Sequence, residues 1–401
     1  MQYSMTRDIP TRLCISASFH EDEMTKLLEN SDPDSGKTPL ALAAESVVNT
    51  ILQKEGLLAL SAPIITLDTG KKDGSHAFQC TFETVPPVSL PEDLSSLELR
   101  FPREEGEHTH LQEVVDQYLS QNAELVPVHE KRCPAEDEIV LADICGAGEN
   151  GPVPGMRSLN QKIRLKASAA APLPEVVALL KTLRPGESAE TRVICPADYP
   201  DPLMRGRPVV MTVTLRAIYR EIRPAFGDAF AQKKGFKDVF QLKQALFEYA
   251  ARTYLQRMQR IARETLLDQL METRTVPVPQ ALHRRFLEIR LRSVRDFFAS
   301  ADMDAAQLEA VLERIRPEAE AQAMRDARRH TFLLALALRE KLVVTTDELE
   351  EKLRELAEYQ HTPYEELHAS MWNNGGINDL YEKLLAEKSL ALLGRSARIA
   401  A

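Results

Sequence analysis

Three glycines stand in the spacing of a dinucleotide-binding loop in this 401-residue chain: Gly146, Gly148 and Gly151. Such a GxGxxG sequence binds the pyrophosphate where a helix begins directly after it, because the amides of the first turn point at the phosphates. Here Pro152 and Pro154 follow at once, and proline breaks a helix interior. The pattern therefore predicts the loop of a β-hairpin rather than a cofactor site.

Two further patterns resemble parts of known sites without completing them. Gly36-Lys37-Thr38 has the end of a phosphate loop, but Ser31 stands where the loop needs its first glycine. His108 and His110 lie two residues apart in a polar stretch that favours a solvated loop, and the sequence contains no HExxH or Cys/His cluster. It also lacks a GxSxG nucleophile motif. We expect no nucleotide, no metal and no other cofactor.

The cysteines and the apolar segments indicate the compartment. Five cysteines (Cys14, Cys80, Cys133, Cys145 and Cys195) form no CxxC pair, and their odd number favours reduced thiols. The first residues lack the charged-then-apolar order of a signal peptide. The longest helical apolar run, 332–338, is too short to span a bilayer. We expect a cytoplasmic protein without a membrane segment.

Charge is unevenly distributed along the chain, and its net value is −10. Residues 1–101 carry 8 Lys/Arg against 15 Asp/Glu, residues 102–222 carry 14 against 18, and residues 223–401 carry 28 against 27. No segment has the basic excess of a nucleic-acid-binding domain. We expect no DNA partner.

Proline divides the chain into two kinds of structure. Of 24 prolines, 20 lie at or before Pro224, and only four follow. Because proline disrupts helix interiors, the first part is predicted to hold strands, turns and short helices, and the second to hold long helices. The predicted fold class is therefore α+β and multidomain, with an all-α C-terminal domain.

Periodicity places the elements that would carry any site. Strands are predicted at 13–19, 77–82, 139–145, 162–166, 190–194 and 209–220, and helices at 21–28, 40–58, 111–122 and 175–183. Beyond 226 the pattern is helical, with a break at 276–279 and a helix at about 318–342. Capping boxes are predicted at Thr345 with Glu348 and at Thr362 with Glu365.

The helix predicted from Gln280 to Ser300 has two apolar stripes. One contains Leu282, Phe286, Ile289 and Phe297, and the other contains Leu287, Leu291, Val294 and Phe298. A helix with two apolar faces is either buried on both sides or leaves one face as a binding surface for apolar segments. Both interpretations stay open, and the candidate binding residues are Phe286, Leu287, Leu291, Val294 and Phe298.

Several segments, in collinear order, resemble the trigger factor family, bacterial chaperones that meet nascent chains at the ribosome. Residues 82–90 (FETVPPVSL) resemble the family's FEVxPEVEL stretch, and 121–126 (QNAELV) its linker. Residues 139–146 (IVLADICG) resemble the VxIDFxG strand, and 183–187 (LRPGE) the MKxGE turn. Asp198-Tyr199, Phe230 with Lys234-Gly235, and 276–279 (VPVP) continue the match.

The resemblance implies four segments and their roles. Residues 1–101 would be an α+β N-terminal domain of the ribosome-binding type, shortened here, and 102–133 a linker. Residues 134–222 would form a β-rich domain like that of FKBP, a prolyl isomerase, and 223–401 the helical arms that hold clients. The family docks on the ribosome through Gly-Phe-Arg-x-Gly-Lys, of which Asp32-Pro-Asp-Ser-Gly-Lys37 retains only Gly36 and Lys37. Two aspartates there predict weakened ribosome binding, since such binding depends on cation–phosphate attraction.

The isomerase domain implied by the resemblance lacks aromatic residues. FKBP-type enzymes enclose proline in an aromatic-walled pocket, and Tyr199 is the single aromatic residue between Pro134 and Ile218. By resemblance, the remaining pocket positions are aliphatic or acidic: Asp143, Ile144, Val153, Leu173, Val176 and Met211. We expect a degenerate pocket with little or no isomerase activity, unless Phe101 or Tyr118 supplies a further aromatic.

Together these observations predict a chaperone that binds unfolded or nascent polypeptides through apolar surfaces, without ATP. Two alternatives stay open: an active prolyl isomerase, and an adaptor for one dedicated protein partner.

Overall fold

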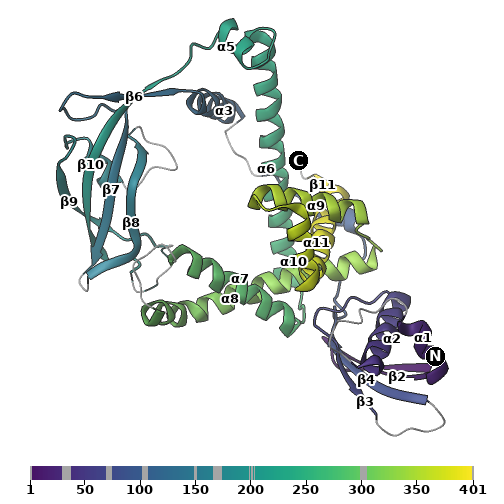
Figure 1. Cartoon of the computed structure of the whole chain (residues 1–401). Coiled ribbons are helices and arrows are strands. Elements are labelled where there is room, and N and C mark those ends of the chain that lie inside the picture. Colours follow the sequence, from purple (N-terminus) through teal and green to yellow (C-terminus); the bar gives the residue numbers. More distant parts are fainter. Residues whose placement is uncertain are drawn as a thin grey trace. The chain divides into compact units, whose positions relative to one another are not determined.

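The computed structural model describes residues 2–28, 38–68, 75–101, 107–148, 151–165, 174–197, 199, 202, 204–298 and 305–399. The chain forms two compact units, whose elements are labelled in Figure 1. The first contains residues 1–102, 259–288 and 320–401, and the second contains 103–258 and 289–319. Three long helices contribute to both units: α6 (Val239–Thr273), α7 (Gln280–Phe298) and α8 (Ala305–Arg339).

The N-terminal part of the first unit is an antiparallel sheet covered by one helix (Figure 1). Strands β1 (Gln2–Ile9), β2 (Arg12–His20), β4 (Ser75–Glu83) and β3 (Ile64–Leu67) lie in the order β1-β2-β4-β3. Short helices η1 (Glu21–Glu23) and α1 (Met24–Leu28) follow β2. Alternate residues of β2 are buried, as expected for a strand with one face on a core.

Helix α2 (Pro39–Glu55) supplies the other half of this core. The Thr38 side chain accepts a hydrogen bond from the Ala41 amide and so begins the helix, and Pro39 occupies the first turn, where its missing N–H costs nothing. Gly56 ends it in the left-handed conformation at φ 61°. The apolar face of α2 packs on the sheet through Ala43, Val47 and Ile51.

The C-terminal part of the first unit is helical. Helices α9 (Thr346–Gln360), α10 (Tyr364–Asn373) and α11 (Gly376–Ser396) follow α8, and short η2 (Leu94–Ser96) precedes β5 (Glu98–Leu99). Strand β11 (Arg398–Ile399) pairs in parallel with β5. One buried cluster therefore joins the end of the N-terminal segment to the helices; its members include Leu94, Leu99, Leu266, Leu270, Phe332, Leu336 and Leu393.

The second unit contains a five-stranded antiparallel sheet in the order β6-β10-β7-β8, with β9 also pairing with β10. Its strands are β6 (Glu124–Val128), β7 (Ile139–Gly148), β8 (Gly151–Arg164), β9 (Ser188–Ile194) and β10 (Pro208–Ile222). Helix α4 (Pro174–Leu180) packs Val176 and Leu180 on the sheet. Helices α3 (Glu107–Gln121) and α5 (Asp228–Lys233) pack with the start of α6 around Phe230 and Leu242.

The fold class expected from the sequence is confirmed: two separate sheets with helices precede a helical C-terminal region. The three spaced glycines also behave as predicted, because β7 and β8 are antiparallel neighbours and Gly148 lies opposite Gly151. The periodicity did not identify β1, β3, β5, β6 and β11, and it predicted only the end of β8. The four segment boundaries stay a prediction.

Three local predictions are wrong. Helix α8 begins at Ala305 and continues through Pro317, because loss of one amide donor is offset by burial of Ile315 and Ala319 beside it. The two histidines lie in α3 rather than in a loop, and His110 Nε2 is 2.9 Å from Thr253 Oγ1 on α6. Thr362 does not cap α10, whose N-cap is Pro363; the Thr362 hydroxyl instead donates to the Gln360 carbonyl.

Candidate functional site

Five of the predicted pocket residues come together in the core of the five-stranded sheet. Ile144 on β7, Val153 on β8, Val176 on α4, Tyr199 and Met211 on β10 belong to one buried cluster. Each is less than a tenth exposed, so their side chains form a closed core rather than the wall of an open site. Leu173 lies outside the described residues.

Asp143 is held by its neighbours in this sheet. Its Oδ1 accepts a 2.7 Å hydrogen bond from the Asn160 amide, and its Oδ2 accepts a 2.6 Å bond from Arg216 Nε. The Asn160 hydrogen bond, together with that from Arg216, lowers the pKa of the Asp143 carboxyl despite its burial. A charged carboxylate with both oxygens engaged fixes the β7–β8 pairing, and this position is poorly suited to act on a substrate.

Methionine side chains fill the space beside Gly146 and Gly148. A Cβ built on Gly146 would lie 2.8 Å from Met156 Cβ and 3.0 Å from Met211 Sδ. A Cβ on Gly148 would lie 3.3 Å from Met204 Cε. The flexible thioethers of methionine fill irregular gaps well. Gly146 and Gly148 therefore allow close packing of these side chains, and no pattern in the sequence indicated it.

The two aromatic residues that could have completed an isomerase pocket lie in other clusters. Tyr118 on α3 packs its ring 6.0 Å from that of Phe230, and Phe101 packs beside the Leu94–Leu99 cluster of the first unit. Neither belongs to the cluster around Tyr199. The cluster therefore keeps the aliphatic character that the sequence predicts.

Helix α7 leaves part of its apolar surface open. Leu282 is fully buried and Phe298 is 2% exposed, whereas Ile289 and Phe297 are 52% and 44% exposed. Phe286, Leu287, Leu291 and Val294 are half-buried, and the ring of Phe286 packs against His330 of α8 at 5.5 Å. Each predicted stripe is thus buried at one residue and open at others. Of the five candidate binding residues, Phe298 is the one that is not accessible.

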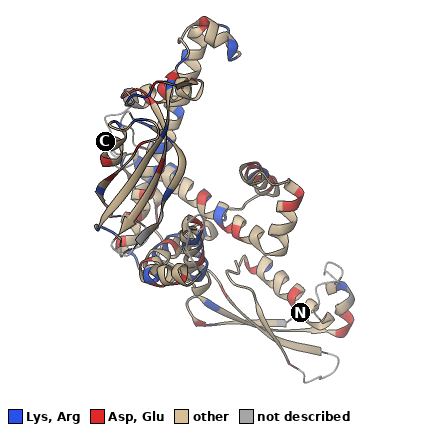
Figure 2. Cartoon of the chain, turned by 60° about the vertical axis from the view of Figure 1, so that its left-hand side comes forward, with Lys and Arg blue, Asp and Glu red and all other residues tan. Residues whose placement is uncertain are grey.

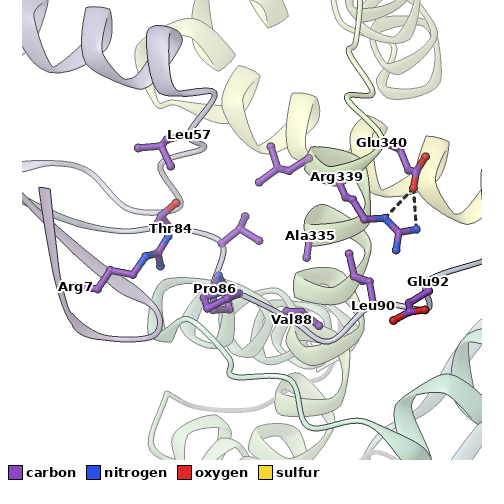
Figure 3. Close-up of a pocket in the computed structure, with 13 residues that line it drawn as sticks. Arg7, Leu57, Thr84, Pro86, Val88, Leu90, Glu92, Ala335, Arg339 and Glu340 are labelled. Carbon is purple, nitrogen blue, oxygen red and sulfur yellow. Dashed lines mark hydrogen bonds and ion pairs between the residues drawn. The ribbon is translucent and has the colours of Figure 1, made fainter.

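A cavity of about 860 Å³ in the first unit was not predicted (Figure 3). Its apolar lining comes from the residue after the C-cap of α2, from the irregular segment after β4 and from α8: Leu57, Val85, Pro86, Pro87, Val88, Leu90, Ala335 and Leu338. Arg7, Thr84, Glu92, Arg339 and Glu340 also line it, and Arg339 pairs with Glu340 at 2.7 Å. The proline-rich sequence 85–91 was the available signal, because proline prevents this segment from pairing as a strand.

The surface charges are mixed in sign. Figure 2 shows lysines and arginines interspersed with aspartates and glutamates along the helices, in keeping with the near-neutral count of residues 223–401. The predicted ribosome-docking residues Gly36 and Lys37 lie outside the described residues. Within the described part of the chain, no group of three His, Cys, Asp or Glu residues could hold a metal ion, and no helix there is long and apolar enough to cross a membrane.

These features define a protein of two compact units with exposed apolar side chains on its C-terminal helices, among them Ile289 and Phe297. The family described as "Bacterial trigger factor protein (TF) C-terminus" matches residues 238–394. Trigger factors of Oleidesulfovibrio alaskensis and of Nitratidesulfovibrio vulgaris strain Miyazaki F are 26% and 27% identical over 84% and 89% of this chain, and over 76% and 83% of their own length. A solved structure of a trigger factor chaperone aligns with 98% of this chain and 99% of its own at 18% identity and a TM-score of 0.38.

The chain is thus similar to trigger factors over most of its length, and the C-terminal family match spans α6, α7, α8, α9, α10 and most of α11. The resemblance drawn from the sequence is confirmed.

Proposed function

We propose that this protein is a chaperone that binds unfolded or nascent polypeptides through apolar surfaces of its C-terminal helices, without a nucleotide. The observation that carries the proposal is the open apolar surface of α7, where Ile289 and Phe297 are exposed within the family-matched part of the chain. The similar proteins are named trigger factors, and we expect this chain to act in the cytoplasm.

The size of this surface suits weak and reversible binding. Burying one Leu or Phe side chain contributes about 1.5–3 kcal/mol. Association costs translational freedom and orders side chains, at least about 4 kcal/mol. A few contacts on α7 therefore give modest affinity and fast release. Apolar contact is also tolerant of client sequence.

The cavity beside residues 84–92 is a second candidate contact point. Its apolar lining with charges at its edge fits an extended apolar segment with polar flanks. Several weak sites on one chain would raise the overall affinity for a long unfolded client, because a second contact is intramolecular.

Suppression of aggregation tests the proposal. A chemically denatured test protein is diluted into the full-length chain, and light scattering is followed without nucleotide. We expect the Ile289→Gln/Leu291→Gln variant to suppress aggregation less than the unchanged protein does, at nearly unchanged thermal stability. Phe240→Gln is the matched control, since Phe240 lies on α6 and is 73% exposed. Equal suppression by all three proteins would remove α7 as the client surface.

Client breadth separates this function from an adaptor role. A chaperone should suppress the aggregation of several unrelated denatured proteins. Activity restricted to one of them would favour a dedicated partner.

A further inference from the structure

Two helices of the second unit contact the connection between β9 and β10. Arg205, in this connection, donates from Nη1 to Glu318 Oε2 of α8 at 2.7 Å. Its Nε donates to the Tyr199 carbonyl oxygen at 2.6 Å. One guanidinium thus holds the backbone next to the Tyr199 ring and also pairs with a helix more than one hundred residues away in sequence.

The second contact is aromatic. The rings of Tyr199 and Phe297 of α7 lie 6.2 Å apart with an interplanar angle of 82°, the edge-to-face geometry that aromatic pairs favour. Phe297 in turn lies 5.0 Å from Phe298, again edge to face, and Phe298 is buried. The end of α7 therefore reaches the isomerase-like core through a pair of phenylalanines.

The ion pair and the ring contact differ in kind, but both lie in the connection between β9 and β10. An ion pair between partly exposed side chains contributes little alone, because water screens it. Here the Arg205–Glu318 ion pair is combined with a ring contact from another helix, α7. The two contacts are linked, because Arg205 donates a hydrogen bond to the backbone carbonyl of Tyr199, whose ring contacts Phe297. Tyr199 is only 7% exposed, whereas Phe297 remains accessible on its other side.

We propose that Tyr199 and Arg205 form a docking site for the chain's own helices α7 and α8, occupied by Phe297 and Glu318. The ring of Tyr199 is then covered by Phe297 of the same chain. An aromatic or prolyl side chain of another polypeptide reaches Tyr199 only after Phe297 has left. The docking site does not rest on the proposed client-binding function, because it concerns contacts within one chain.

Variants on the helix side test this without altering the isomerase-like domain. Phe297→Ala and Glu318→Arg in the full-length protein should each increase, several-fold, the rate of amide hydrogen exchange in residues 204–207 and in α8 from 305 to 319. Exchange in β7 and β10 should stay unchanged. Phe240→Ala is the control, since it removes an equally large exposed ring from α6.

Charge reversal gives a second, independent readout. Adding Arg205→Glu to Glu318→Arg restores attraction between the two positions, and exchange in α8 should fall below that of Glu318→Arg alone. The proposal is overturned if Phe297→Ala and Glu318→Arg exchange like Phe240→Ala, or if the reversed pair shows no recovery in α8. Loss of protection throughout β7 and β10 in either helix variant would also contradict it, because the contact would then be part of the domain core.

Discussion

At the scale of residues, a buried carboxylate is paired with an arginine where α7 meets α11. Arg285 Nη1 is 2.7 Å from Glu382 Oε2 and 3.0 Å from Asp379 Oδ1, and Glu382 is only 2% exposed. Burial raises the pKa of Glu382 to about 7, with Arg285 opposing the rise and Asp379 adding to it. Burial, and then the positive charge of Arg285, lower the pKa of His330 to about 4.

These two groups should have opposite effects on stability between pH 4.5 and 6.5. A raised carboxyl pKa gives stability that is present below pH 4.5 and lost as pH rises towards 7. A lowered histidine pKa gives stability that is present above pH 6.5 and lost as pH falls towards 4. Each slope approaches about 1.4 kcal/mol per pH unit, and in the unchanged protein they offset each other.

Denaturant unfolding of two variants separates the slopes. Relative to the unchanged protein, Glu382→Gln should become more stable as pH rises from 4.5 to 6.5, and His330→Gln should become less stable. Parallel pH profiles for all three proteins would contradict the assignment. Arg285→Ala should be most destabilising above pH 7, because Glu382 is ionised there and would be left buried without its partner.

The core around Tyr199, which the resemblance assigns to an isomerase pocket, should show little catalysis. Its five described pocket residues are buried, and the Asp143 carboxylate is engaged by Asn160 and Arg216. A proline-peptide assay should therefore stay near the uncatalysed rate, set by a barrier of about 18–20 kcal/mol. Turnover like that of an ordinary FKBP-type enzyme, abolished by Tyr199→Ala, would show that the core opens to substrate.

The sequence predicted which of these residues lie in one cluster, but not which other side chains pack among them. Resemblance assigned Ile144, Val153 and Tyr199 to one pocket, and they do lie in one cluster. That Met156 and Met204 close over the glycines depends on the register of β7 against β8 and on the turn before β10, which no local pattern encodes. The Arg285–Glu382 pair joins residues 97 positions apart and was equally invisible.

At the scale of elements, the starts of α9 and α10 show that local sequence sets some helix ends and tertiary packing sets others. Thr345 and Glu348 form the predicted capping box, in which the Glu348 carboxylate also accepts from Lys388 Nζ at 2.6 Å. The same signal at Thr362 fails, since the helix there begins one residue later with Pro363 as N-cap. Periodicity identifies helices well, whereas their ends depend on neighbours.

Alanine variants of Thr345 and Thr362 measure how much each side chain contributes to the stability of the following helix. Thr345→Ala should cost about 1 kcal/mol of unfolding free energy, because it removes the acceptor of the Glu348 amide. Thr362→Ala should cost much less, as its hydroxyl caps no helix amide in the structure. Equal losses in denaturant unfolding would show that the two threonines have the same role.

The surface of α7 was predicted only in part for a similar reason. Its residues 280–288 belong to the first unit and 289–298 to the second. The buried side is therefore set by different neighbours at the two ends. Neither of the two apolar stripes is buried or open throughout, and a periodic pattern cannot indicate where the neighbours change.

At the scale of the whole molecule, charge should limit binding to the ribosome. The net charge is −10, and residues 1–101 alone carry seven more acidic than basic side chains, 15 against 8. By the resemblance in sequence, Asp32 and Asp34 correspond to the family's basic docking loop. Co-sedimentation with ribosomes should therefore be weak at physiological salt. Pro33→Phe/Asp34→Arg should improve it, and tight salt-resistant binding of the unchanged chain would contradict this expectation.

The central claim is that the chain binds unfolded polypeptide through an apolar surface of its C-terminal helices, without nucleotide. The most direct measurement is a binding titration of one labelled test protein, in its permanently unfolded and its native form, with and without ATP. We predict reversible binding of the unfolded form alone, unaffected by ATP, weakened in Ile289→Gln/Leu291→Gln and retained in Phe240→Gln. Equal affinity for the native form, or full affinity in the α7 variant, would contradict the claim.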